Sequence, residues 1–211
     1  MRRFFQSILC LALCLAPAVT ALAVEEAPSP YADVSAEDTF YDAVSLVHEK
    51  GIMNGVGEGL FAPQHTTDRA ALVTALWRLA GEPVVNYAMR FSDVAEDAWY
   101  AEAVRWAASA GIASGYDDMT FAPHDALTRE QLCVMVYRYE QLMGGGFSGA
   151  WMFLLAYPDA MDVSDWAYEA VCWMSMHQLT TPTDAPLVPQ GSVTRGELAG
   201  VLAAYTQIAS R

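Results

Sequence analysis

The sequence predicts an all-α protein built from three helix–loop–helix repeats. Residues 31–80 and 91–140 correspond to each other at an offset of 60, and a third copy follows over residues 157–209. Each copy contains two segments whose apolar residues fall on one helical stripe. Self-similarity at a period of this length is typical of repeated units that bury a shared core.

The first helix of each repeat has a narrow apolar stripe and ends at a turn residue. In the second repeat the stripe includes Trp99, Ala103 and Trp106, and the third repeat keeps the same spacing. Gly51 and Gly111 follow the helices of the first two repeats, and the left-handed conformation that ends a helix favours glycine. The pattern therefore predicts one short helix, then a turn-rich loop, in each copy.

The second helices share an N-terminal pattern. Thr194 with Glu197, and Thr128 with Gln131, have the spacing of a capping box, while Asp68 is a capping residue without the second partner. Their apolar residues then recur with the i, i+3, i+4, i+7 spacing, at Leu72, Ala75, Leu76 and Leu79; at Leu132, Met135, Val136 and Tyr139; and at Leu198, Val201, Leu202 and Tyr205. Three long amphipathic helices are therefore expected.

The N-terminal segment has the features of a secretory signal peptide over residues 1–23. Arg2 and Arg3 precede a short apolar run, and Ala21-Leu22-Ala23 offers small residues to a signal peptidase. The run is shorter than the ~20 residues that span a bilayer, although a retained anchor is the alternative. Residues 24–30 form a short linker, and the mature chain is expected outside the cell.

Residues 141–156 form a longer linker between the second and third repeats. It contains three consecutive glycines and then the apolar stretch Trp151 to Leu155. An exposed apolar stretch promotes aggregation, so these side chains are expected to pack onto the core. A partner-binding site is the alternative.

Composition excludes several functions. The net charge of −14 becomes −16 when Arg2 and Arg3 are removed with the signal peptide, and such acidity disfavours binding to nucleic acid or to a membrane surface. Cys133 and Cys172 fall in apolar helical patterns and are expected to be buried thiols, with a disulfide as the alternative. No zinc-binding spacing, catalytic triad or phosphate loop stands out, so we expect no metal, no cofactor and no enzyme activity.

The order of short motifs in all three repeats resembles the S-layer homology domain family. The residues that carry the resemblance are Phe91-Ser92-Asp93-Val94, Trp99-Tyr100, Ala103-Val104, Gly111-Ile112 with Gly115, Phe121-Ala122-Pro123 and Leu127-Thr128-Arg129-Glu130. The resemblance implies a pseudo-threefold helical spindle with grooves between repeats. It further implies non-covalent anchoring to a bacterial cell wall through a secondary wall polysaccharide, commonly one that bears pyruvate ketals.

The family's key arginine corresponds to Arg69, Arg129 and Arg195. The helix dipole disfavours a cation at the first position of a helix, so an arginine there in every copy suggests a ligand. Its planar fork can hold a carboxylate in bidentate fashion, and the N–H groups of the helix N-terminus are expected to bind the same anion. A salt bridge to an aspartate of a neighbouring repeat is the alternative interpretation.

The resemblance assigns further binding residues to each repeat. They are Asp33, Asp93 and Asp159; Trp99 and Trp166; and Gly55 and Gly115. A tryptophan can stack on a sugar ring or simply belong to the core, and the glycines can admit a ligand or serve only as turn residues.

The repeats depart from the family pattern in different ways. Thr39 replaces the tryptophan in repeat one, and Gln178 and Pro182 replace the glycines in repeat three. The prediction is therefore one good groove, lined chiefly by repeat two, with Arg129, Asp93 and Trp99 as its leading residues. Surface-layer or other surface proteins are further expected partners, and a protein–protein assembly module or a wall-polysaccharide hydrolase are the alternative functions.

Overall fold

The computed structural model describes residues 29–149 and 152–209, and this part of the chain is helical. The α-helices are α1 (Tyr41–Glu49), α2 (Arg69–Leu79), α3 (Ala101–Ser109), α4 (Arg129–Leu142), α5 (Tyr168–Met176) and α6 (Arg195–Ala209), with a 3-10 turn η1 at Ala160–Asp162. Pairing between extended residues is limited, in the described ranges, to isolated β-bridges. The all-α prediction is confirmed.

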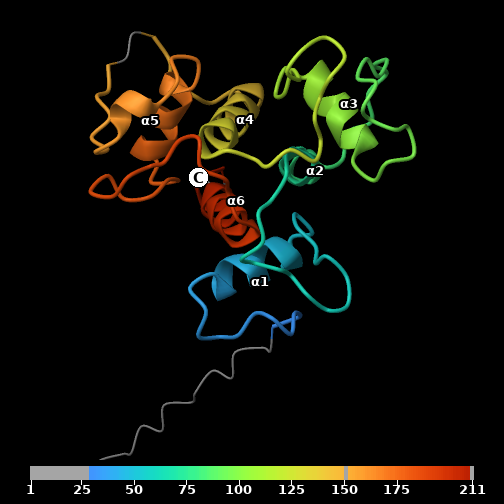
Figure 1. The fold of residues 1–211 in the computed structure, drawn as a ribbon, viewed down its shortest axis with the longest axis horizontal. Helices are drawn as coiled ribbons and strands as arrows, with labels where there is room; N and C mark the ends of the chain where they lie inside the picture. The colour runs from blue at the N-terminus through green and yellow to red at the C-terminus, as the bar shows by residue number, and fades with distance from the viewer. Residues whose placement is uncertain (1–28, 150–151, 210–211) are drawn as a thin grey trace, which may run out of the picture.

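The helices form a three-armed arrangement around a central bundle. Figure 1 shows the second helices α2, α4 and α6 near the centre and the first helices α1, α3 and α5 on the arms. The principal packing pairs are α1 with α6, α2 with α3, and α4 with α5. The first helix of each repeat therefore packs against the second helix of the repeat before it, and the last repeat closes the ring onto the first.

Backbone hydrogen bonds close this ring just before the central helices begin. The Thr67 N–H donates to Val193 O at 2.9 Å, the Val193 N–H to Leu127 O at 2.8 Å, and the Leu127 N–H to Thr67 O at 3.0 Å. The three residues occupy the same position in the three repeats. They form a closed triangle of hydrogen bonds that fixes the helix N-termini relative to one another.

The predicted caps of the central helices and the glycine stops of α1 and α3 are confirmed, whereas Trp99 and Trp166, expected within the first helices, lie in the turns just before α3 and α5. Thr128 and Gln131 form a complete capping box at α4, and the Asp68 carboxylate accepts the Ala71 N–H at the start of α2. Gly51 and Gly111 take left-handed conformations after α1 and α3, with φ of 67° and 73°. In repeat three Gln178 takes the same left-handed conformation after α5, with a φ of 57°.

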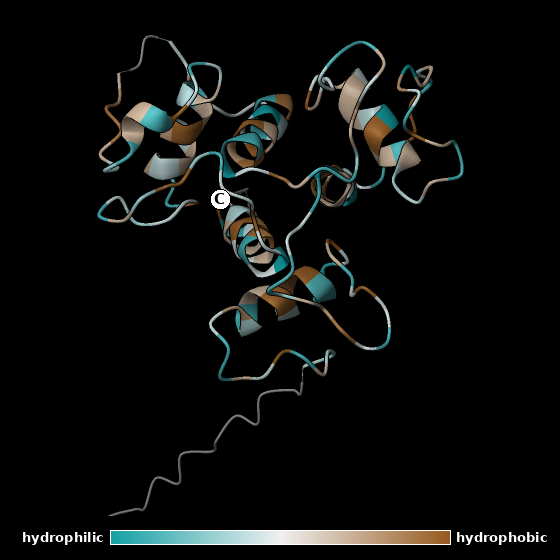
Figure 2. Ribbon diagram, in the orientation of Figure 1, coloured by the Kyte–Doolittle hydropathy of each residue, from teal (hydrophilic) through white to brown (hydrophobic). Residues whose placement is uncertain are grey.

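The core lies between the central helices and the arms. Figure 2 shows apolar and polar residues on different faces of the helices, as the sequence periodicity predicts. Fully buried side chains from all three repeats fill the space between helices, among them Leu72, Leu76, Val136, Leu198 and Leu202. Cys133 and Cys172 are free and buried, which confirms the thiol interpretation. Within the described ranges, no helix has both the length and the apolarity needed to cross a membrane.

The apolar linker packs onto the core only in part. Leu155 is buried and Phe153 is half-buried, while Met152 is 98% exposed and Leu154 is 84% exposed. The expectation that the whole stretch packs inward is therefore wrong for two of its side chains, because an extended segment points alternate residues to opposite sides. Trp151 and the signal-peptide segment lie outside the described residues.

Candidate functional site

The arginines predicted from the repeat pattern stand at the first position of α2, α4 and α6. Two of them, Arg69 and Arg195, make the same contacts with the loop of the next repeat. Arg69 Nε donates to Phe121 O at 3.1 Å, and Arg195 Nε donates to Phe61 O at 2.8 Å. Each guanidinium carbon also lies 4.8 Å from the ring centroid of the same phenylalanine. The hydrogen bond from Nε occupies one of the five N–H donors of each guanidinium group, and the ring contact is a cation–π interaction.

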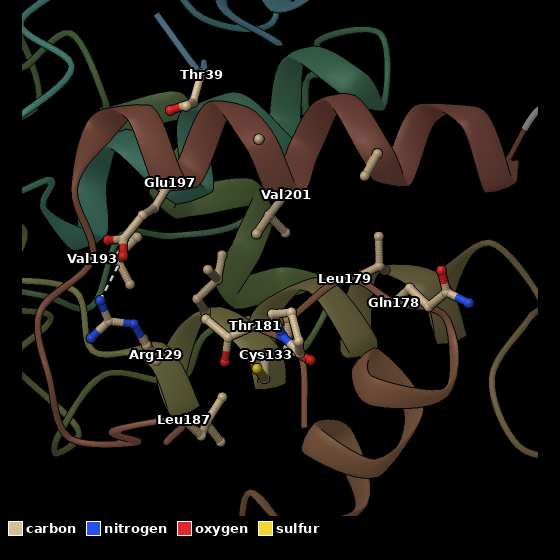
Figure 3. Close-up of a pocket in the computed structure, with 15 residues that line it drawn as sticks. Thr39, Arg129, Cys133, Gln178, Leu179, Thr181, Leu187, Val193, Glu197 and Val201 are labelled. Atoms are coloured by element: carbon tan, nitrogen blue, oxygen red, sulfur yellow. Dashed lines mark hydrogen bonds and ion pairs between the residues drawn. The ribbon is translucent and has the colours of Figure 1, made fainter. Parts of the chain in front are cut away.

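Arg129 departs from this arrangement because Leu187 stands where the other loops have phenylalanine. Its Nη2 instead donates to Glu197 Oε1 at 2.6 Å, across the boundary between repeats two and three (Figure 3). Glu197 also caps α6 by accepting the Thr194 N–H at 2.7 Å. Partial burial acts to raise the pKa of Glu197, but the Thr194 N–H and the Arg129 guanidinium hold it below its usual value. Arg129 thus forms a salt bridge to a neighbouring repeat, but its partner is a glutamate and not the aspartate that the alternative interpretation expected.

The N-terminal amides of the central helices are not free to bind an anion, contrary to the expectation from the sequence. In α2 the Arg69 N–H donates to Asp125 O and the Ala70 N–H to Pro123 O, both in the next repeat. The third amide of the helix is held by the capping side chain of Asp68. The corresponding amides of α4 and α6 have the same kinds of partner. At this end of each helix, the first three backbone amides are therefore already paired within the protein.

The three repeated aspartates hold the loops. Asp93 accepts the N–H groups of Phe121 and Ala122 at 2.9 and 2.6 Å, and Asp33 and Asp159 make the corresponding pair of bonds in their repeats. Burial acts to raise the pKa of Asp33 and Asp159, but these backbone donors outweigh it and lower both. The aspartates have a structural role that the sequence resemblance did not assign.

Trp99 and Trp166 belong to the surface rather than to the core. Their side chains are 62% and 57% exposed, because both lie in the turns just before α3 and α5 and not on the helical stripe that the sequence predicts. The hydrophobic residues of the stripe that are buried begin further along, for example at Ala103 and Trp106. Exposure leaves the indole faces available to a ligand.

A groove of about 210 Å³ brings together residues from all three repeats. Arg69 comes from repeat one, the Ser114–Tyr116 segment from repeat two and Trp166 from repeat three. We name it the Arg69 groove. Its wall is completed by Ile112, Ala113, Gln131, Val134, Met135 and Arg138. The Arg69 guanidinium carbon lies 4.7 Å from the centroid of the Tyr116 ring, so cation and aromatic faces stand side by side in this groove.

A second groove, of about 610 Å³, has the same construction one repeat further on (Figure 3). Arg129 comes from repeat two, residues 178–182 and Glu197 from repeat three, and Thr39 from repeat one. We name it the Arg129 groove. Much of the rest of its lining is apolar, from Leu132, Cys133, Leu187, Val193, Val201 and Ala204.

The third member of the set is marked by Arg195. Its Nη2 donates to Asn54 O at 2.8 Å, next to Gly55 in the loop of repeat one. By the threefold relation, Trp99 of repeat two stands at the position that Trp166 holds in the Arg69 groove. We name this the Arg195 site.

The structure therefore distributes the predicted residues differently from the sequence interpretation. Arg129 and Gly115 line different grooves, because each arginine reaches the loop of the following repeat. Gly55 and Gly115 are required by packing: a Cβ on Gly115 would lie 2.6 Å from Phe91 Cε1, and one on Gly55 would lie 2.4 Å from Leu60 O. Sequence reasoning missed Glu197 as the partner of Arg129, since the capping box already accounted for it.

Metal binding has no support in the part of the chain that the structure describes. No cluster of three histidine, cysteine, aspartate or glutamate side chains is suited to hold an ion there.

Two inter-repeat grooves and the equivalent Arg195 site, on a closed helical ring, define a class of tandem-repeat helical module with candidate binding sites between its repeats. The S-layer homology domain matches the chain three times, over residues 30–72, 90–133 and 156–199, and the chain belongs to this family. Family membership and the relatives below associate it with the bacterial cell surface or wall.

Similar proteins differ widely in what their names describe. An amylopullulanase of Thermoanaerobacterium thermosulfurigenes is 28% identical over 165 residues, which cover 76% of this chain and 9% of the relative. The exoglucanase XynX of Acetivibrio thermocellus is 27% identical over 163 residues, or 76% of this chain and 15% of the relative. The surface-layer 125 kDa protein of Lysinibacillus sphaericus is 32% identical over 129 residues, which cover 60% of this chain and 10% of the relative. The chain thus matches only a small part of each relative's length.

Proposed function

We propose that the chain attaches non-covalently to the bacterial cell wall by binding an anionic secondary wall polysaccharide, of the type that carries pyruvate ketals. The observation that carries the proposal is the Arg69 groove, in which a guanidinium group, an exposed indole and a tight glycine loop meet. A guanidinium fork suits a carboxylate, and an indole face suits a sugar ring. The chain is a binding module in this proposal, and the catalysis named in some relatives belongs to the rest of their length.

Charge differences among the grooves support the Arg69 groove as the principal site. It contains Arg138 and Gln131, whereas the Arg129 groove has Ala204 and Glu197 at the same repeat positions. Formally, the Arg69 groove carries two positive charges on these residues and Arg69, while Arg129 and Glu197 cancel.

Aromatic residues rank the grooves in the same order. Trp166 lines the Arg69 groove, but Thr39 stands at its position in the Arg129 groove. This ranking differs from the sequence interpretation, which gave Arg129 the leading role. The Arg195 site has Arg78 at the Arg138 position and Trp99 at the Trp166 position, which ranks it above the Arg129 groove. It ranks below the Arg69 groove because Val56 stands at the position of Tyr116, the ring that contacts Arg69.

The acidity of the whole chain does not oppose this binding. Repulsion between exposed charges fades beyond roughly 10 Å at ordinary salt concentrations. A hydrogen-bonded guanidinium–carboxylate contact acts at contact distance and contributes about 1.5–3 kcal/mol. Arg69 is only 4% exposed, so water competes little for its side of the contact.

Co-sedimentation with purified cell walls tests the proposal. The mature chain is expected to pellet with intact walls and to stay in solution with walls from which the secondary polymer has been chemically removed. Equal pelleting with both preparations would contradict polysaccharide binding.

A matched pair of variants then tests the groove. Arg69→Gln is expected to weaken wall binding at least tenfold, by loss of about 1.5 kcal/mol or more. Arg105→Gln removes the same charge from an arginine that pairs with Glu102 on its own helix, and it should bind as the parent does. If Arg129→Gln weakened binding more than Arg69→Gln, the ranking of the grooves would be wrong.

Assembly of copies of the chain with one another is a second candidate, favoured by exposed apolar side chains in and beside repeat three. Met152, Leu154 and Met161 are 98%, 84% and 95% exposed. Analytical ultracentrifugation of the mature chain and of a variant with all three residues changed to serine would test it. Self-association that persists in the variant would exclude these residues as the contact.

A further inference from the structure

Arg90 brings an additional cation to the rim of the Arg69 groove. It directly precedes Phe91, and its guanidinium carbon lies 4.9 Å from the centroid of that ring. Its Nη2 donates to Ser114 O at 2.8 Å, and Ser114 is one of the residues that line the groove. The side chain is therefore held against the groove loop although the residue is exposed.

Each of the two arginines contacts one ring of a tilted aromatic pair. The guanidinium carbon of Arg69 lies 4.8 Å from the Phe121 centroid, the Phe121 and Phe91 centroids are 5.3 Å apart, and the guanidinium carbon of Arg90 lies 4.9 Å from the Phe91 centroid. The two guanidinium carbons are consequently at most about 15 Å apart, a span that one short oligosaccharide can cover.

Both guanidinium groups retain donors for a ligand. A guanidinium has five N–H groups, and a single protein hydrogen bond is seen for each of these two side chains among the described residues. The carboxylates that act electrostatically on Arg69 are Asp125 and Asp93, and Asp93 is engaged with the loop, since it accepts the N–H groups of Phe121 and Ala122.

The additional cation is peculiar to this groove. The positions equivalent to Arg90 hold Pro30 in repeat one and Ala156 in repeat three. Lys and Arg together number only 11 in the whole chain, yet Arg69, Arg90 and Arg138 all contact this groove or its loop. In a chain of net charge −14, this gathering of scarce cations is best explained by a ligand of high negative charge.

We propose that Arg90 extends the Arg69 groove into a two-anion site, which selects polymer segments that carry two negatively charged groups over segments that carry one. This inference rests on the proposed polysaccharide binding. The first anion binds at Arg69 and the second, on a neighbouring sugar, binds at Arg90. Arg90 is thus a specificity-determining residue that repeats one and three lack.

The test uses fragments of the secondary polymer, released from purified walls by partial depolymerisation and separated by anion exchange into singly and doubly charged pools. Binding of each pool to the mature chain is measured by titration calorimetry. The parent is expected to bind the doubly charged pool about tenfold more tightly than the singly charged pool. Arg90→Gln should remove this preference by weakening the binding of the doubly charged pool about tenfold and that of the singly charged pool much less, whereas Arg90→Lys should retain part of the preference.

The controls separate this inference from the proposed function. Arg105→Gln changes the net charge equally but lies outside the groove and should keep the preference. If Arg90→Gln lowered the affinity for both pools alike, Arg90 would be a support for the loop and the two-anion site would be refuted. If the parent bound both pools equally, selection would be refuted while polysaccharide binding stood. If the parent bound neither pool, the proposed function itself would fail.

Discussion

Replacing Asp159 by asparagine keeps the shape of the side chain and removes one of the two acceptors that hold the third loop. Asp159 Oδ1 and Oδ2 accept the N–H groups of Leu187 and Val188 at 2.9 and 2.7 Å. An asparagine oxygen can keep one bond, but its NH₂ group then faces the other N–H. Hydrogen bonds to charged groups contribute about 1.5–3 kcal/mol. Since Val188 is half exposed, water replaces part of the loss, and we expect Asp159→Asn to cost about 2 kcal/mol.

The cost should be visible in the unfolding of the whole mature chain. Val188 has a φ of 52°, which a β-branched residue adopts only under constraint, so the loop depends on this tie. Urea denaturation followed by tryptophan fluorescence should report the loss, and the melting temperature should fall by about 4–8 °C. The matched control is Asp184→Asn, because Asp184 is exposed in the same loop and makes no side-chain hydrogen bond to a described residue.

The effect should depend on pH. The backbone donors lower the pKa of Asp159 in the folded chain against the opposing influence of burial, so its stabilisation is fully present above the unfolded value of about 3.9. It is lost as pH falls below that value through the lowered folded pKa. The difference between the parent and Asp159→Asn should therefore shrink as the pH falls below about 4. A variant as stable as Asp184→Asn at pH 7, or a difference that grows in acid, would refute the reasoning.

Other expectations follow from individual residues. Gly115→Ala should lower the free energy of unfolding by about 2–4 kcal/mol, because the new Cβ overlaps the Phe91 ring and the φ of 77° disfavours alanine. Gly111→Ala, where the Cβ meets open space, should lower it by only about 1–2 kcal/mol. Equal losses on urea denaturation would contradict the packing argument. Trp166→Ala should weaken wall binding about tenfold and change the unfolding free energy by less than about 1 kcal/mol, as measured by co-sedimentation and calorimetry; a large loss of stability would mean that the indole is structural. Burial raises the pKa of the Cys133 and Cys172 thiols to about 12 and about 11, so a disulfide reagent at pH 8 should label them only when urea is added; rapid labelling of the native chain would show that they are accessible.

Local structure was predictable from the sequence because its determinants are close together in the chain. The capping box of Thr128 and Gln131 spans four residues, and the helical stripe of α4 repeats within a few turns. Such features depend on backbone hydrogen bonds that the same segment makes. The starts of the central helices, the glycine stops of α1 and α3 and the buried thiols were accordingly predicted correctly, whereas Trp99 and Trp166 were wrongly placed inside α3 and α5, which begin two residues later.

The composition of the grooves was not predictable from the repeats alone. Arg69 and Phe121 are 52 residues apart, and Arg195 and Phe61 are 134 apart, so each groove depends on how neighbouring repeats pack. A repeat alignment shows which residues are equivalent, but it does not show which of the equivalent residues meet. Trp166 is a second example. The apolar stripe of repeat three allowed either a core or a surface position for this residue, which lies just before α5.

The closed triangle of Thr67, Leu127 and Val193 has a consequence for how the chain matures. A polypeptide emerges N-terminus first, but α1 packs on α6, which is made last. The apolar face of α1 therefore stays uncovered until α6 has been synthesised and packs against it. When α6 packs on α1, Arg195 also reaches Asn54 O. The loop of repeat one, which is synthesised first, therefore receives its arginine from the helix that is synthesised last. A chain that is cut short loses both the closure of its fold and the Arg195 site, which couples the capacity to bind to the completion of synthesis.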